Sequence, residues 1–250
     1  MKSTITQAVI LMAGSGSRLR GADETFLKPL VPVLGRPLVS YTIDGLVRAG
    51  VEIIKAVVGF QSERLSAAVK GLIPRGIELE LIENREWQKQ NGISVLAAKN
   101  HVTAPFLLTM SDHLFDASIV DLLLRSANPN LLNVAIDRKL SSIFDLADAM
   151  KLQTKQDRIV AIGKNLAQYD AIDIGLFVCP LEIFDYLERA KRDDDCSLAD
   201  GVRAMADDDK ARGIDIGNAW WQDVDTPEML SEAERHLHEG RATRSVSAQA

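Results

Sequence analysis

The chain has 250 residues, of which 46% are hydrophobic and 26% charged, and its net charge is −6. These values are ordinary for a folded soluble protein, and the length suits one large α/β domain. No apolar run approaches the roughly 20 residues of a membrane span, and the negative charge argues against a broad nucleic-acid-binding face. The two cysteines, Cys179 and Cys196, exclude a disulfide scaffold and are expected to be buried or inert thiols. We expect a cytoplasmic protein with no nucleic-acid partner and no membrane insertion.

The first predicted element is a buried strand over residues 8–13, which runs into the glycine-rich stretch GSGSR. The spacing excludes two familiar motifs: a dinucleotide fingerprint needs glycine at the position of Leu19, and a P-loop needs lysine directly after Gly21. Glycines allow successive backbone N–H groups to form an anion-binding concavity, and Arg18 and Lys28 add two positive charges. The stretch therefore indicates a local pocket for a small anion such as phosphate, with a solvated surface turn as the alternative.

Apolar periodicity then predicts a regular alternation of helix and strand as far as residue 137. Nearly continuous β-branched runs such as VEIIKAVVG are typical of strands covered on both faces. The alternation favours an α/β fold with a mostly parallel central sheet and helices on both faces. The predicted helices are residues 36–50, 62–72, 93–101 and 118–127, and the predicted strands are residues 51–59, 77–83, 105–112 and 131–137.

The second half departs from this rhythm near Ala149, where two apolar segments separated by the polar turn KQD predict an antiparallel hairpin. We predict one domain over residues 1–239 and a disordered tail over residues 240–250, because RATRSVSAQA has no apolar face. His236 and His238 are expected to be solvated, since residues two apart on a helix do not share a face. The elements predicted here are a hairpin at 150–154 and 158–164, a strand at 171–179, helices at 180–192 and 197–205, a short strand near Ile214, and a last helix ending near His238.

Acidic residues at strand ends are the next signal, because ligands of parallel sheets gather beyond the carboxyl ends of the strands. Asp112 closes one predicted strand, and Asp223 and Asp225 lie in the segment WWQDVDT. If the glycine loop holds a nucleoside triphosphate, Asp112 and Asp223 are suited to bind Mg²⁺, with Asp225 as a weaker candidate. For Asp112 alone, capping of a helix N-terminus is the alternative.

Several ordered segments carry a family resemblance. LMAGSGSRL followed by FLKPL resembles the signature of the sugar-phosphate nucleotidyltransferase superfamily. NGISVLAAKNHV, FLLTMSDHLFD, AIDR, IGKNLAQYDAIDIGLFV and WWQDVDT extend the similarity over about residues 6–238, to the MobA-like NTP transferases and within them to the CTP:inositol-1-phosphate cytidylyltransferases. The resemblance implies a Rossmann-like, GT-A-like nucleotidyltransferase fold with Mg²⁺ as cofactor. It also implies a cytidylyltransferase in which an acceptor phosphate attacks the α-phosphorus of CTP, giving a CDP-alcohol and pyrophosphate.

The resemblance also implies roles for individual residues. Arg18 and Lys28 would be catalytic, with Arg18 at the triphosphate and Lys28 reaching the α-phosphate or the acceptor phosphate. Asp137, Lys164 and Asp173 would line the acceptor pocket. The nucleotide-binding set would be Met12, Ala13, Gly14, Ser15, Gly16, Ser17, Asn91, Gly92, Ser94 and Asp112.

The acceptor is less determined than the family. Inositol 1-phosphate is favoured, and phosphocholine or an alkylphosphonate, aminoethyl- or hydroxyethylphosphonate, are the alternatives. Choline would call for an aromatic cage, for which Trp220, Trp221 and Tyr169 are among the few candidates. An alternative from another class is a non-catalytic nucleotide-binding regulatory protein. Some relatives carry a fused membrane CDP-alcohol phosphotransferase; here that second enzyme is expected to be a separate protein.

Overall fold

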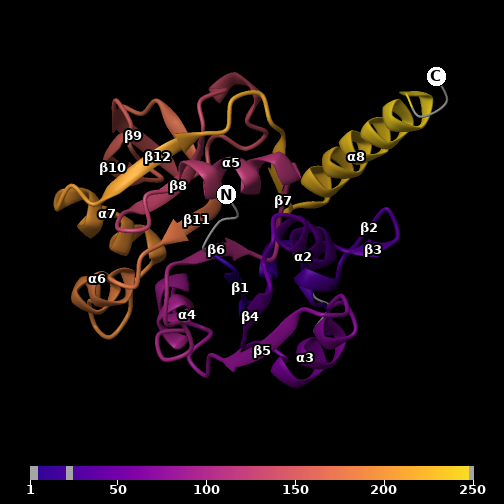
Figure 1. Cartoon of the computed structure of the whole chain (residues 1–250), viewed down its shortest axis with the longest axis horizontal. Coiled ribbons are helices and arrows are strands. Elements are labelled where there is room, and N and C mark those ends of the chain that lie inside the picture. The colour runs from indigo at the N-terminus through magenta and orange to yellow at the C-terminus, as the bar shows by residue number, and fades with distance from the viewer. Residues whose placement is uncertain (1–4, 21–24, 248–250) are drawn as a thin grey trace.

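A nine-stranded sheet forms the framework of the molecule (Figure 1). The computed structural model describes residues 5–20 and 25–247, apart from the side chains of Ser17, Arg20 and residues 241–247. In spatial order the strands are β5 (Glu78–Glu83), β4 (Ile53–Val58), β1 (Gln7–Met12), β6 (Phe106–Met110), β11 (Ala171–Cys179), β8 (Leu132–Asp137), β12 (Ala211–Asp215), β10 (Arg158–Gly163) and β9 (Lys151–Lys155).

The strands of this sheet run in one direction except β10 and β11, which lie antiparallel to their neighbours. The half made of β5, β4, β1 and β6 is entirely parallel, and antiparallel pairs begin at β11. This arrangement confirms the predicted mixed, mostly parallel sheet and the hairpin between β9 and β10. In addition, β9 pairs with β11, so β11, β8, β12, β10 and β9 form a closed ring of strand pairings.

Helices cover both faces of the sheet, as predicted. Strand β1 is buried on both sides, because Val9 and Leu11 belong to one apolar core whereas Ala8, Ile10 and Met12 belong to the other. This alternation follows from the period of two along a strand. One core is covered by α2 (Leu38–Arg48), α3 (Ser62–Lys70) and α5 (Ala117–Ser126), and the other by α4 (Asn91–Ala97), α6 (Ile183–Ala190) and α7 (Leu198–Asp207).

Short elements at the carboxyl edge of the sheet place the strand-end acids. After β6 the chain continues as a short strand that pairs with a second short strand near the carboxyl end of the molecule, with His113 opposite Asp223. This pairing lies outside the elements predicted from sequence, and it brings Asp112 beside the segment that contains Asp225. The short elements are α1 (Ser17–Arg20), η1 (Lys28–Leu30), β2 (Pro32–Val33), β3 (Arg36–Pro37), β7 (His113–Phe115), η2 (Leu140–Ser142) and β13 (Trp221–Asp223).

The last helix is longer than predicted. Helix α8 (Pro227–Ser247) continues well past His238 and extends away from the body of the molecule (Figure 1). The predicted tail over residues 240–250 overlaps the end of α8, and residues 248–250 lie outside the described part of the chain. Gly240 is the single glycine of this segment and costs about 1 kcal/mol of helix stability relative to alanine. The arginine and alanine residues after it favour helix.

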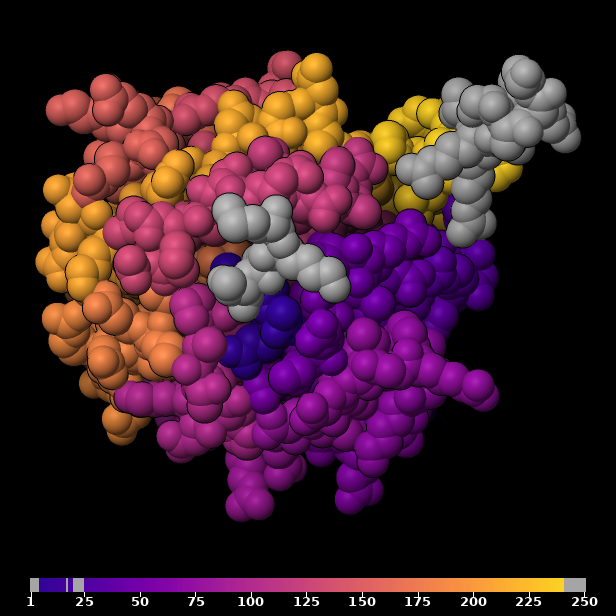
Figure 2. All heavy atoms as spheres, viewed as in Figure 1, coloured from indigo at the N-terminus to yellow at the C-terminus, as the bar shows by residue number. Residues whose placement is uncertain are grey.

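The two halves of the chain pack against each other. In Figure 2 the amino-terminal half, from indigo to magenta, and the carboxyl-terminal half, from orange to yellow, form one continuous surface on the face shown. Cys179 and Cys196 are free thiols in the buried core, as expected. Among the described helices, none combines the length and the apolar character that crossing a membrane requires.

The core of the sheet provides a stability test. Phe177 of β11 is fully buried, opposite Leu108 of β6 and Val134 of β8. Phe177→Ala should lower the free energy of unfolding by about 3–5 kcal/mol, because it leaves a cavity that the sheet cannot close. Urea denaturation measures this change, with Phe144→Ala as the matched control because that side chain is 52% exposed. Equal losses in the two variants would contradict the packing described here.

Candidate active site

A cavity of about 1120 Å³ lies at the carboxyl edge of the sheet. Its walls come from segments spread along the whole chain, as expected where strand-end loops converge. The predicted site residues that line it are Met12, Ala13, Gly14, Ser15, Gly16, Arg18, Lys28, Asn91, Ser94, Asp112, Asp137, Lys164, Asp173, Asp223 and Asp225. Of the other two predicted residues, Gly92 is not among the residues lining the cavity, and the Ser17 side chain lies outside the described part of the chain.

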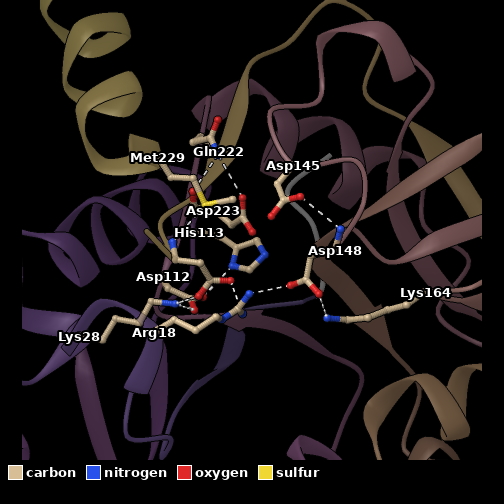
Figure 3. Close-up of polar contacts among 11 residues, drawn as sticks. Arg18, Lys28, Asp112, His113, Asp145, Asp148, Lys164, Gln222, Asp223 and Met229 are labelled. Atoms are coloured by element: carbon tan, nitrogen blue, oxygen red, sulfur yellow. Dashed lines mark hydrogen bonds and ion pairs between the residues drawn. The ribbon is translucent and has the colours of Figure 1, made fainter. Parts of the chain in front are cut away.

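Lys28 is the centre of the polar network in this cavity (Figure 3). Its Nζ donates a hydrogen bond to Asp112 Oδ2 at 2.5 Å and a second one to Asp225 Oδ1. Arg18 of α1 donates to the other oxygen of Asp225, Oδ2, at 2.5 Å. Two cations from the glycine-rich segment thus meet two aspartates from distant strand ends.

The buried positions of these groups make their pairing essential. Burial alone would raise the pKa of Asp112, but Lys28 and His113 hold it well below its usual range. Burial alone would lower the pKa of Lys28, but Asp112 and Asp225 raise it. His113 Nδ1 lies 2.7 Å from Asp112 Oδ1, and because this carboxyl group is ionised, Nδ1 is the donor. Lys28 and Asp112 are therefore both charged in the folded protein.

In the structure Lys28 bridges Asp112 and Asp225, whereas the sequence favoured Asp223 as the partner of Asp112 in holding Mg²⁺. Asp223 accepts a hydrogen bond from Gln222 Nε2 at 3.1 Å and has none from Lys28 among the contacts of the described residues. Burial raises the pKa of Asp223, and the neighbouring Asp225 and Asp112 carboxylates add to the shift. Period-two alternation puts both aspartates of DVD on one side of the chain, so only the tertiary structure distinguishes them.

Asp112, Asp223 and Asp225 are the candidate ligands of the predicted Mg²⁺. Among the described residues, no group of three or more His, Cys, Asp or Glu side chains has the arrangement of a complete metal site. Mg²⁺, however, is usually bound through one or two carboxylates, with water and substrate phosphates supplying the other oxygens. Burial raises the pKa of Asp223, and the nearby carboxylates of Asp225 and Asp112 add to the shift, so three carboxyl groups lie close to one another here. Asp112 and Asp225 therefore fit a cation shared with a phosphate substrate.

The residues predicted to read the base have structural contacts of their own. Asn91 Oδ1 accepts a hydrogen bond from the Leu198 N–H at 2.8 Å, at the start of α7. Ser94 Oγ accepts one from Asn84 Nδ2 at 3.0 Å. Gly92 lies against the chain before α7, where an added Cβ would come within 2.6 Å of the Cys196 carbonyl oxygen. The segment therefore joins α4 to α7, and Asn91 and Ser94 border the cavity from that junction.

Asp137 lines the cavity, and its carboxylate is engaged in hydrogen bonds within the protein. The side chain is almost fully buried, and both of its oxygens have partners. Oδ1 accepts from the Lys139 N–H at 2.7 Å and from Lys139 Nζ at 2.9 Å, and Oδ2 accepts from Trp221 Nε1 at 2.8 Å. Asp137 thus anchors Lys139 and Trp221, which themselves line the cavity.

Lys164 is joined to Arg18 through an aspartate that sequence reasoning missed. Asp148 Oδ1 accepts from Lys164 Nζ at 2.5 Å, and Oδ2 accepts from Arg18 at 2.6 Å (Figure 3). The hydrogen bond from Lys164 lowers the pKa of Asp148, and Arg18 adds to the shift. One carboxylate therefore connects a cation predicted for the triphosphate with a cation predicted for the acceptor.

The cavity contains further residues that sequence reasoning missed. His113 had a signal, because it directly follows Asp112, which was already singled out. Lys139 and Asp148 had none, because they lie in the largely irregular chain between β8 and β9. His236 is half-buried and stacks on Trp220 with ring centroids 4.0 Å apart, so the prediction that it is solvated is wrong; His238 is exposed, as predicted.

Asp173 provides a pH test of the cavity. Burial raises the pKa of Asp173 to about 6, and its Oδ1 accepts from the Gly175 N–H at 2.8 Å. An unfolded aspartate has a pKa of about 3.9, so the folded state binds more protons between these values and stability falls as the pH rises. Asp173→Asn keeps the accepting oxygen without the charge. Urea denaturation should show this variant gaining stability relative to wild type from about pH 4.5 to about pH 7.5; a constant difference would contradict the burial of this carboxyl group.

The comparisons with known proteins agree with this geometry. Residues 8–143 match the family of MobA-like NTP transferase domains. The "Bifunctional IPC transferase and DIPP synthase" of Aquifex aeolicus is 31% identical over 234 residues, which are 93% of this chain and 52% of that protein. The protein of the same name from Rubrobacter xylanophilus is 34% identical over 225 residues, 89% of this chain and 50% of that protein. The chain thus spans about half the length of these curated relatives.

A solved structure extends the likeness to the fold of nearly the whole chain. The "inositol-1-phosphate CTP transferase from T. maritima" has a TM-score of 0.80 and 26% sequence identity, over 94% of this chain and 98% of that chain. This neighbour has the nucleotidyltransferase fold that the resemblance implied. The family match covers more than half of the residues of this chain, which therefore belongs to the family of MobA-like NTP transferase domains.

Proposed function

We propose that the protein is a cytidylyltransferase that joins CTP to a phosphorylated alcohol, with inositol 1-phosphate as the favoured acceptor. The observation that carries the proposal is the single cavity in which the glycine-rich turn, Arg18 and Lys28 face the strand-end aspartates while Lys164 and Asp173 border the same space. A nucleotide and a second phosphorylated substrate can meet there. The products would be CDP-inositol and pyrophosphate.

The proposed reaction depends on positioning and charge rather than on a covalent intermediate. The acceptor phosphate would attack the α-phosphorus of CTP in line, with pyrophosphate leaving on the opposite side. Arg18 and Lys28 would hold the phosphates and offset the negative charge that develops between them. Lys28 is suited to this task because its ammonium group is buried and held charged by two carboxylates.

Mg²⁺ is part of the proposal. Asp112 and Asp225 would hold it, and it would neutralise charge on the phosphate oxygens when bound. Because Lys28 lies between these two carboxylates, a phosphate substrate would offer Lys28 an alternative partner as the cation enters. Arg18 and Lys28 would then remain on the phosphates.

The acceptor proposal is supported by the polar character of its end of the cavity. Asp173, Lys139 and Lys164 line the cavity, and a polyol offers many hydroxyl groups to such residues. The names of the relatives, IPC transferase and inositol-1-phosphate CTP transferase, favour the same acceptor. A choline cage is less well supported, because Trp220 stacks on His236 and Trp221 lies parallel to His113, so one face of each indole is occupied. An alkylphosphonate remains the closer rival.

A non-catalytic nucleotide sensor is the alternative from another class. Such a protein would need the glycine-rich turn but not the acids that hold a metal beside the phosphates. The presence of Asp112 and Asp225 on either side of Lys28 favours the enzyme. We also propose that the reaction takes place in the cytoplasm and that a membrane CDP-alcohol phosphotransferase consumes the product.

The reaction itself can be tested with a panel of acceptors. Protein, CTP and Mg²⁺ should release pyrophosphate with inositol 1-phosphate, and kcat/KM should fall strongly for phosphocholine, aminoethylphosphonate and hydroxyethylphosphonate. Sites that hydrogen-bond several hydroxyls reject analogues lacking them by up to roughly 10⁴-fold. Chelation with EDTA should stop the reaction. Release with no acceptor in the panel would favour the sensor, and preference for another acceptor would change the substrate but keep the cytidylyltransferase.

The two aspartates of DVD give a second test. Asp225→Asn should lower kcat by about 10²–10³, because Asp225 contacts both Lys28 and Arg18. Asp223→Asn, two residues away, is the matched control. It should lower kcat much less, because Asp223 accepts a hydrogen bond from Gln222 instead. Pyrophosphate release at saturating substrates measures both, with circular dichroism as the check on folding. Severe loss at Asp223 with little loss at Asp225 would reverse the assignment.

A further inference from the structure

His113 lines the cavity between Asp112 and β11, and the proposed reaction gives it no direct task. Its side chain is largely enclosed, with 17% of it exposed. The backbone around it is held on two sides: Thr42 Oγ1 donates to the His113 carbonyl oxygen at 3.1 Å, and β7 pairs it with Asp223 of β13. The ring therefore occupies a defined position beside the carboxylates (Figure 3).

Strand β11 is shaped to admit this ring. Its register against β8 shifts between Asp173 and Phe177, and Gly175 inside the shifted segment has a φ of +72°. A Cβ at Gly175 would lie 2.6 Å from His113 Nε2, closer than such atoms approach. Both the left-handed backbone and the imidazole ring therefore require glycine at this position. The notch in β11, defined by residues 173–177, is the space that the His113 ring fills.

The imidazole orients one particular carboxylate. Nδ1 donates to Asp112 Oδ1 at 2.7 Å, and Lys28 Nζ donates to Asp112 Oδ2 at 2.5 Å. A carboxylate rotates broadly about its last torsion, so with Lys28 alone either oxygen could face the cavity. The bond from His113 occupies Oδ1 and leaves Oδ2 directed at Lys28.

The opposite side of the ring is also defined. The His113 and Trp221 rings lie nearly parallel, at 12°, with centroids 6.2 Å apart. Trp221 in turn donates its Nε1–H to Asp137 Oδ2. The Trp221 indole thus lies parallel to the imidazole, and Gly175 of β11 lies at its Nε2 edge.

The geometry points to His113 as a positioning residue that sets the orientation of the Asp112 carboxylate, with the notch at Gly175 as the feature that keeps the ring in place. This inference rests on the proposed function, in which Asp112 helps to hold a divalent cation beside the phosphates of CTP. His113 itself touches neither substrate in this role. It acts by leaving one oxygen of Asp112 directed at the reacting phosphates.

Two polar substitutions separate the hydrogen bond from the volume of the ring. Asparagine places its amide nitrogen close to the position of Nδ1, whereas glutamine places it close to Nε2. We expect His113→Gln to weaken Mn²⁺ binding in the presence of CTP, followed by electron paramagnetic resonance, by about 10–100-fold, and to lower kcat by a similar factor. His113→Asn should stay close to wild type in both measurements. KM for the acceptor should change little in either variant.

Two more variants complete the design. Gly175→Ala should act in the same direction as His113→Gln, because the added methyl group displaces the ring without removing it. His101→Gln is the matched control: it removes a histidine–carboxylate bond of the same kind, to Glu80, outside the cavity. It should leave Mn²⁺ binding and kcat unchanged.

Wild-type behaviour of His113→Gln in both measurements would overturn the inference, and so would equal losses in the Asn and Gln variants. Wild-type protein that binds no Mn²⁺ in the presence of CTP would also contradict it. Failure of the proposed function looks different. Wild-type protein that binds Mn²⁺ but releases no pyrophosphate with any acceptor would contradict the transferase, while the Mn²⁺ comparison of the variants would still decide the role of His113.

Discussion

The buried ammonium group of Lys28 is the interaction on which the rest of the site depends. It joins Asp112, 84 residues away in sequence, and Asp225, 197 residues away. Buried charges are costly unless they are paired, so loss of Lys28 would leave both carboxylates without this cation. The glycine-rich turn, the end of β6 and the approach to α8 are thereby held at one point.

From this centre the polar contacts extend in two directions along the cavity. Toward Lys164 they pass through Arg18 and Asp148, so the Asp148 carboxylate binds both cations. In the proposed function these two cations would each bind one of the two substrates. Toward β13 they pass through His113, whose ring faces Trp221. Charge pairing therefore organises one wall, and ring packing and directional hydrogen bonds organise the other.

The architecture of the sheet matches this division. The parallel half, from β5 to β6, carries the glycine-rich turn and Asp112, which line the cavity. The half that closes as a ring of strand pairings carries Asp137 and Asp173 at the edge where β11 starts beside the end of β8. A closed ring has fewer free strand edges, and this suits the part of the molecule that must hold buried polar groups in fixed positions. At the bulge in β11, between Asp173 and Phe177, the register against β8 shifts beside the site.

The sequence by itself determined the alternation of strands and helices, the parallel character of the first half and the antiparallel character of the second, because apolar periodicity is a local property of the chain. It also predicted that Lys28 and Asp112 lie together at one edge of the sheet, because residues at strand ends and in a glycine-rich turn meet there, and both line the cavity. Only the tertiary structure decided that Asp225 rather than Asp223 shares Lys28 with Asp112, that Asp137 is already satisfied, and that Asp148 joins both ends of the cavity. Those outcomes depend on contacts between segments far apart in sequence and on the path of irregular chain, which no local pattern encodes.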